Sequence, residues 1–532
     1  MPPKRAEGQS RIAGIAGRLQ GCLGPVYGLM MGGILLVCVL FFRIRFGKSE
    51  YCEHFLPPVV LLAFGIVFFT GLYVLCGRLE AAGKLGSRRL FWWLSLFLLA
   101  VQIFAVYNYY FYTDWDVPNL LRLSDAVVHG KDIAEVPGIG YFSRYPNNLL
   151  LACVMTVIRK AAHIVGLHAH EYFAILCVQC GLNTLTGLLL AQTLDRLFGS
   201  RKFSLFGYVL YVLLVGMSPW VSIPYSDSMG LIFPMLMVYI YVGRARAKRA
   251  WLSWFGISVC AVIGYKLKPQ TFIVCIAIVI IGLLELPRKG RTRDFTKKLS
   301  AVAAGVLCAG LVSQAAIASL HVPVNESMVF QLPHFLMMGM NPEDMGVWSE
   351  QDVKFSGSFA GAEERKQANM DLAMERIREM GPAGLLKHLV RKTLTNYGDG
   401  TFCWSGEGYF FRAVLEERGN PLCGFFRGLY YTREYAEVGK YYALWSNSVQ
   451  MLWLTLLLFN VFAGLARRSS DQDVVMLAII GLTLFEWIFE ARARYLYTYA
   501  PLYILCAMYG FQALKEKDAA RRRDGFGMQT PS

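Results

Sequence analysis

The stretch LFWWLSLFLLAVQIFAVYNYYFYTDWD, residues 90–116, decides the fold class. Residues 90–111 carry no charged side chain, and a helix needs about 20 apolar residues to cross a bilayer. Two carboxylates, Asp114 and Asp116, follow where this span would leave the hydrocarbon. Because hydrocarbon cannot solvate an ionised carboxylate, acids at such a position line a polar cavity, bind a cation or take up protons, unless they simply face water. The stretch therefore predicts a membrane span followed by a functional loop.

The composition of the whole chain agrees with a membrane protein. The chain has 532 residues, of which 55% are hydrophobic, and its mean hydropathy of +0.41 is higher than that of soluble globular proteins. The net charge is +16, but the basic residues concentrate in short loops between apolar segments, as the positive-inside rule describes. This distribution disfavours nucleic acid as a partner. Among 13 cysteines, Cys403 and Cys423 are the pair expected to be able to form a disulfide.

Apolar segments of spanning length recur along the chain and predict an all-α polytopic membrane protein with about 12 transmembrane helices. The expected spans are residues 25–43, 57–76, 90–111, 172–194, 203–221, 229–243, 251–265, 270–285, 299–319, 446–466, 473–490 and 498–514. The basic loops, which include Arg88, Arg246, Arg291 and Arg468, then all fall on one face, the cytoplasm. Both termini are expected in the cytosol.

The apolar segment from Asn148 to Gly166 is left out of this count. Counting it as a span would place every later basic loop outside, against the positive-inside rule. The segment also carries Arg159, Lys160 and His163 near its end. We expect an interfacial or re-entrant helix in the first large outer loop.

The sequence suggests five regions. They are a cytosolic N-terminus with two additional spans at 1–89, a transmembrane core at 90–319 with an outer loop at 112–171, an extracytoplasmic region at 320–445, C-terminal spans at 446–514 and a basic cytosolic tail at 515–532.

Several charged residues lie at span ends on the outer face, against the positive-inside bias. They are Lys266, Lys268, Glu490, Arg492 and Arg494. Because a charge at mid-bilayer costs about 2.5–3.5 kcal/mol, these groups need water or partners, and a shared polar cavity would supply both. Arg and Lys are the natural ligands of a phosphate. The alternative is that they are long basic side chains that reach the interface as anchors.

The acidic residues leave alternatives open. Asp114 and Asp116 coordinate a divalent cation if both point to one side, and one of them is free to act as a general base if they diverge. Asp227 lies in a turn before a span, where helix capping is slightly favoured over catalysis. His168, His170 and Glu171 lack the spacing of a zinc site, so a wet interfacial turn is expected there.

Four motifs occur in an order that is informative as a set. They are Thr113-Asp-Trp-Asp116, Tyr145-Pro-Asn-Asn148, Ser226-Asp-Ser228 and the ending Arg494-Tyr-Leu-Tyr-Thr-Tyr-Ala-Pro501. With them, residues 90–514 resemble the GT-C superfamily of membrane glycosyltransferases, which use polyprenyl-phosphate sugars, and within it the protein O-mannosyltransferases and related bacterial enzymes. The two spans before Leu90 depart from the usual arrangement, in which the acidic loop follows the first span.

The resemblance implies a GT-C-like fold and inverting sugar transfer from a polyprenyl-phosphate donor to a glycan, lipid or protein acceptor on the outer face of a bacterial cell membrane. It implies that Asp116 or Asp114 is the base, and that Lys266, Lys268, Arg492 and Arg494 hold the donor phosphate. The residues expected to contact substrate are Arg144, Tyr145, Asn147, Asn148, Asp227, Gln270, Glu490 and Trp404. No nucleotide site is expected, and the binding of a divalent cation stays open. The alternative function is a transporter or a flippase of lipid-linked glycans.

Overall fold

The computed structural model describes residues 4–42, 55–86, 89–289, 295–406, 413–414, 421–431, 439–466 and 469–527. Arg88, Arg291, Arg468 and the last five residues of the expected tail, 528–532, lie outside these ranges. The described chain is helical apart from one short antiparallel pair, β1 (Phe111–Tyr112) and β2 (Ala413–Val414). In this pair Phe111 faces Val414 and Tyr112 faces Ala413. The pair joins the end of the span 90–111 to the distant region 320–445.

Nine helical segments of the described chain are long and apolar enough to cross a bilayer. They are Ile12–Leu40 in α1 (Lys4–Leu40), α2 (Pro58–Ala81), α3 (Arg89–Tyr109), His168–Phe198 including α7 (Glu171–Phe198), Ser226–Arg246 including α9 (Ser226–Gly230) and α10 (Ile232–Gly243), α11 (Ala250–Leu267), Pro269–Pro287 in η6 (Pro269–Phe272) and α12 (Ile273–Lys289), α13 (Phe295–Ala318) and α18 (Tyr442–Ala463). They coincide with nine of the expected spans, although α1 begins well before residue 25.

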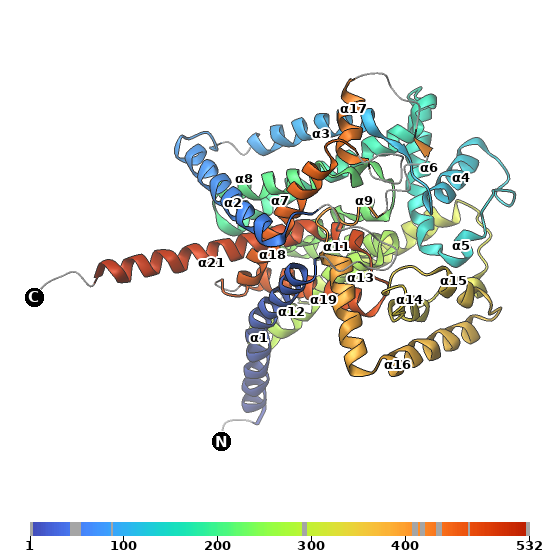
Figure 1. The fold of residues 1–532 in the computed structure, drawn as a ribbon. Helices are drawn as coiled ribbons and strands as arrows, with labels where there is room; N and C mark the ends of the chain where they lie inside the picture. The colour runs from blue at the N-terminus through green and yellow to red at the C-terminus, as the bar shows by residue number, and fades with distance from the viewer. Residues whose placement is uncertain are drawn as a thin grey trace, which may run out of the picture.

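The other three expected spans are helical but do not reach the same length and hydropathy in the described residues. The first, at 203–221, is broken into α8 (Arg201–Tyr211), the π-helical turn η3 (Val212–Gly216) and η4 (Pro219–Ser222). The others are α19 (Ser470–Ile488) and α21 (Ala500–Gly527). In α21, residues such as Leu502, Ile504 and Cys506 are fully buried against the other helices. Protein contacts therefore surround the first part of this helix, whereas its C-terminal part extends away from the bundle (Figure 1).

Glycines let helices approach closely where α1 crosses α18. A Cβ added to Gly24 would lie 2.9 Å from the carbonyl oxygen of Gly464, whereas a Cβ added to Gly33 of the same helix would meet nothing within 4 Å. Small residues at such crossings allow the backbone contact that drives helix association in lipid. The first helix is thus packed directly on the C-terminal helices.

Helices outside the twelve expected spans gather at one end of the bundle (Figure 1). They are α4 (Val117–His129), α5 (Tyr141–Arg144), η1 (Pro146–Asn148), α6 (Leu149–Ile164), η2 (His168–His170), η7 (Glu326–Met328), α14 (Leu332–Gly339), α15 (Glu350–Gly357), α16 (Ala362–Tyr397), α17 (Pro421–Tyr430) and α20 (Ala493–Tyr497). Figure 1 shows α4 to α6 and α14 to α16 at the right, whereas the ends of α1 and α21 point down and to the left. Gly381, with φ +57°, and Pro382 divide α16 into two arms.

The helix α6 has the properties expected of an interfacial helix. It has 16 residues and is not among the spanning segments of the described chain. Leu151 and Met155 on one face are fully buried, whereas Val157 is 67% and Ile164 87% exposed. Such a helix buries one face in protein and offers the other to the lipid headgroup region.

The basic loops meet at the other end of the bundle. The Lys202 backbone N–H donates to Glu80 Oε1 at 3.1 Å, and Arg246 Nη2 donates to the Arg196 carbonyl at 3.3 Å. Arg244 forms a 2.7 Å ion pair with Asp471. Loops that the positive-inside rule assigns to one face therefore lie side by side.

Candidate functional site

A cavity of about 750 Å³ lies between the ends of several core helices and α14. Its lining includes nine of the residues predicted for the site: Asp116, Tyr145, Asn147, Asn148, Lys268, Gln270, Glu490, Arg492 and Arg494. They come from the loop after α3, from η1 and the residue before it, from η6 and the residue before it, and from α20 and the loop before it. Segments far apart in sequence thus contribute to one polar cavity.

The two acidic residues of the Asp-Trp-Asp motif diverge. Asp116 is half-buried and lines the cavity, whereas Asp114 is exposed and does not. Trp115 between them has φ +57°, a left-handed conformation that costs a non-glycine residue roughly 1–2 kcal/mol. This conformation turns the backbone so that one carboxylate faces inward. The arrangement fits the single-base alternative and does not form a two-carboxylate cation site.

A chain of hydrogen bonds holds the Asp116 carboxylate. The Tyr225 hydroxyl donates to Asp116 Oδ2 at 2.7 Å. The Asn148 amide in turn donates to the Tyr225 hydroxyl at 3.3 Å and to the Tyr141 hydroxyl. Asp116 is also the residue before α4, where the helix dipole favours a negative charge. The carboxylate is thereby kept oriented at the cavity wall.

Two cations share one buried carboxylate beside Asp116. Lys268 Nζ lies 2.5 Å from Asp227 Oδ1, and Arg494 Nε lies 3.6 Å from Asp227 Oδ2. All three residues are at least nine-tenths buried. Burial lowers the pKa of the Lys268 ammonium, and the Asp227 charge opposes this shift. Asp227 therefore neutralises only one of the two positive charges that it faces.

Aromatic rings position these cations. Lys268 Nζ lies 3.9 Å from the ring centre of Tyr495, and the Arg494 guanidinium carbon lies 4.2 Å from that of Trp115. The capping role favoured for Asp227 is wrong. Asp227 is the second residue of α9, the N-terminus of this helix has no side-chain cap, and the Asp227 carboxylate faces the two cations.

A loop beside α20 supplies the remaining charges. Glu490 Oε1 lies 3.4 Å from Arg492 Nε, and the Tyr495 hydroxyl donates to Glu490 Oε2 at 3.4 Å. Lys392 supports this loop from α16 by donating to the Phe489 carbonyl at 2.6 Å and the Gly339 carbonyl at 2.8 Å. Burial lowers the pKa of Lys392 to about 7. Lys392 is therefore a supporting residue that the sequence did not reveal.

His334, which lines the cavity, is another residue that the sequence did not reveal. The Ser356 hydroxyl donates to Asn369 Oδ1 at 2.9 Å, so it accepts the 2.6 Å hydrogen bond from His334 Nδ1. This tautomer leaves Nε2 as an unprotonated acceptor, and within the described chain this buried atom has no hydrogen-bond partner. Burial lowers the pKa of His334 to about 4. No spacing marks this residue, because Ser356 and Asn369 are brought to it only by the fold.

Some predicted residues lie elsewhere. Arg144 is exposed and Lys266 is half-buried, and neither lines the cavity. Trp404 is 2% exposed, packs edge-on against Trp220 at 5.4 Å and donates to the Tyr430 carbonyl at 2.7 Å. An indole held in the core in this way does not contact a ligand in the cavity, so the predicted substrate contact is not formed.

Cys403 and Cys423, the pair that could have formed a disulfide, are not bonded to each other. The Cys423 thiol instead donates to Asn108 Oδ1 at 3.6 Å.

The rest of the cavity wall is apolar and aromatic. It includes Leu332, Phe335, Met338, Phe485 and Phe489. An anionic group can bind to the cationic side while an attached hydrocarbon chain lies against this apolar side. Asp116 adds a carboxylate that can accept a proton.

A family model described as "Conserved hypothetical integral membrane protein" matches residues 81–514. The match contains every residue of the cavity and begins at Ala81, the last residue of α2, so α1 and the rest of α2 lie outside it. Neither the curated proteins nor the solved structures gave a match.

Proposed function

We propose that this chain, which belongs to the family of conserved hypothetical integral membrane proteins, is an inverting glycosyltransferase. In this proposal a sugar moves from a polyprenyl-phosphate donor to a glycan, glycolipid or protein acceptor. Family membership and the nine apolar helices make the chain a multi-pass membrane protein. The observation that carries the proposal is the placement of Asp116, Lys268 and Arg494 around one cavity.

The cationic side of the cavity fits the donor phosphate. Asp227 alone neutralises only one of the charges of Lys268 and Arg494, and Arg492 adds a third cation to the lining. Glu490 offsets part of this charge through Arg492. As the sugar leaves, negative charge grows on the phosphate, and preorganised cations stabilise it in the transition state. The apolar wall near Leu332 and Phe335 suits the first units of the polyprenyl chain.

Asp116 serves as the general base. Its carboxylate takes the proton from the acceptor hydroxyl as the oxygen attacks the anomeric carbon and the bond from that carbon to the phosphate oxygen breaks. Attack opposite to the leaving phosphate inverts the configuration. General-base catalysis of this type contributes typically ~10²–10⁴-fold. Tyr225 holds the carboxylate in position by its 2.7 Å hydrogen bond.

The proposal includes an outward orientation in a bacterial cell membrane, with twelve spans and a GT-C-like arrangement. Counting α8 with η3, α19 and α21 as crossings gives the twelve, and the cavity then lies on the face opposite to the basic loops. An even number of crossings places both termini on the same side, and the basic loops on that side assign it to the cytosol. In Figure 1, α4 to α6 and α14 lie at the right, whereas the start of α1 points down and the end of α21 points to the left, in support of this orientation.

Purified protein in lipid nanodiscs tests the activity. The probes are polyprenyl phosphates carrying labelled hexoses or pentoses, with membranes from cells that lack the protein as the source of acceptor. We expect label to leave one donor for a non-donor fraction, Asp116→Asn to reduce the rate at least 100-fold, and Asp114→Asn to reduce it much less. Equal rates for wild type and Asp116→Asn would remove Asp116 as the base. In sealed proteoliposomes, movement of intact labelled donor across the bilayer without transfer would favour the flippase alternative.

A further inference from the structure

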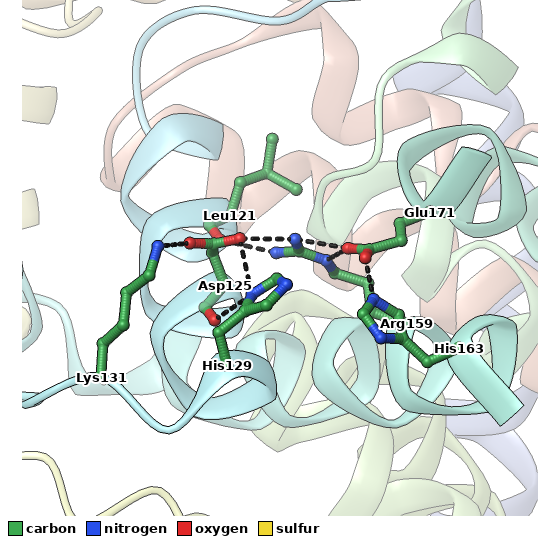
Figure 2. A network of polar contacts seen from close by, with 7 residues as sticks. All are labelled: Leu121, Asp125, His129, Lys131, Arg159, His163 and Glu171. Carbon is green, nitrogen blue, oxygen red and sulfur yellow. Dashed lines mark hydrogen bonds and ion pairs between the residues drawn. The ribbon is translucent and has the colours of Figure 1, made fainter. Parts of the chain in front are cut away.

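A second polar cluster lies outside the cavity, where α4, α6 and α7 meet (Figure 2). His129 ends α4, His163 lies in the last turn of α6 and Glu171 begins α7. Each offers one potential ligand atom, and these three atoms lie within 4.8 Å of one another. None of the three lines the cavity that holds Asp116. The cluster is therefore a separate feature of the fold.

The three side chains are held as metal ligands are held. His129 Nδ1 lies 3.0 Å from the Asp125 carbonyl, so this nitrogen carries the proton and Nε2 is left as an acceptor. A hydrogen bond from one ring nitrogen to a carbonyl is the usual way to orient a metal-binding histidine. Glu171 Oε2 accepts a hydrogen bond from Arg159 Nε at 2.5 Å, and Glu171 Oε1 is hydrogen-bonded to His163 Nε2.

Arg159 accounts for only part of the cluster. Figure 2 shows its guanidinium between Asp125 and Glu171, with Nη2 at 2.9 Å from Asp125 Oδ1 and Nη1 donating to the Leu121 carbonyl at 3.0 Å. Lys131 pairs with the other Asp125 oxygen at 2.6 Å. These contacts fix the carboxylates, but they do not explain why His129 and His163, from different helices, each hold a potential ligand atom within 4.8 Å of one on Glu171. The His129 and His163 rings lie 5.4 Å apart, and the His168 ring lies 4.4 Å from that of His163.

We propose that His129, His163 and Glu171 bind a zinc ion that fastens α4 to the start of α7. Two imidazole nitrogens and one carboxylate oxygen form a donor set that zinc prefers, and the fourth position is left to His168 or water. On binding, the cation replaces the proton between His163 and Glu171, and both groups turn toward it. Because α4 begins directly after Asp116, an ion here would fix the helix that follows the acidic loop.

The test uses the full chain purified in detergent, stripped with a chelator and titrated with zinc chloride or cobalt chloride alone. We expect one ion per chain, a higher melting temperature with zinc, and the visible absorption of tetrahedral cobalt. His129→Asn and His163→Asn should each weaken binding at least tenfold. The matched control is His321→Asn, because His321 is an exposed histidine outside the cluster and its loss should change nothing.

Two outcomes would overturn the site. The first is the absence of stoichiometric binding by the stripped wild-type chain. The second is an affinity that stays the same in both cluster variants, or that falls equally in His321→Asn, since the ion would then bind elsewhere. His129→Asn keeps the test valid even if His163→Asn does not fold, because the His129 side chain is 42% exposed and its removal leaves the Arg159 contacts intact. Its melting temperature without metal should equal that of the stripped wild type.

Discussion

At the scale of single residues, the contact between Tyr225 and Asp116 connects the fold to the proposed chemistry. Tyr225→Phe keeps the ring and removes the hydroxyl that donates to Asp116 at 2.7 Å. A hydrogen bond to a charged group is worth about 1.5–3 kcal/mol, so we expect transfer to slow by roughly tenfold or more. Tyr265→Phe is the control, because Tyr265 lines the same cavity but its hydroxyl is not a partner of Asp116 in the described contacts. Equal rates for the two variants would contradict this role.

His334 predicts a dependence of stability on pH. Its pKa in the folded chain is about 4, below the ordinary value of 6.5, because the buried imidazole resists protonation. This contribution to stability is present above pH 6.5 and is lost as the pH falls toward 4. In His334→Gln, the melting temperature should therefore fall less between pH 6.5 and 4 than in the wild type. His321→Gln, in an exposed position, should follow the wild type, and identical curves for all three proteins would refute the prediction.

The sequence predicted residues of the cavity where a charged side chain departed from the positive-inside rule. Lys268 and Arg494 were marked by their place on the face that lacks the basic loops, and the structure brings both to the cavity. The same rule marked Lys266, which lies two residues before Lys268 and does not line the cavity. The role of Asp227 between two cations could not be predicted, because it depends on the meeting of α9, α20 and the turn before η6.

At the scale of elements, the crossing of α1 and α18 offers a matched pair of substitutions. Gly24→Leu would press a side chain against the backbone of Gly464, whereas Gly33 of the same helix has open space around it. Overpacking of this type costs typically about 1–3 kcal/mol. We expect a lower melting temperature in detergent for Gly24→Leu and an unchanged one for Gly33→Leu. Equal values would mean that α1 does not pack on α18 in this way.

Hydropathy and length predicted most spans because each is a local property of the sequence. The broken helix at 203–221 was not predicted, since its π-helical turn at Val212–Gly216 leaves the apolar composition unchanged. The cluster of His129, His163 and Glu171 was hidden for another reason. The local spacing of His168, His170 and Glu171 is wrong for zinc, and the partners of Glu171 come from α4 and α6.

At the scale of the whole molecule, the orientation in the membrane can be tested by thiol labelling. Glu363, on α16, is 82% exposed at its side chain, and Arg246 is exposed at the end with the basic loops. With the exposed Cys22 and Cys308 replaced by Ser, an impermeant reagent should label Glu363→Cys in intact cells and should label Arg246→Cys only after permeabilisation. The reverse pattern would place the cavity on the cytosolic side.

The measurement that tests the central claim most directly is a comparison of the lipid-linked and envelope glycans of cells. Four strains are compared at matched protein abundance: wild type, a strain without the protein, Asp116→Asn and Asp114→Asn. The account predicts that one sugar is missing from an envelope glycan in the second and third strains, that its polyprenyl-phosphate donor accumulates there, and that Asp114→Asn retains most of the modification. Unchanged glycans and donor levels in the strain without the protein would contradict glycosyl transfer as the function of this chain.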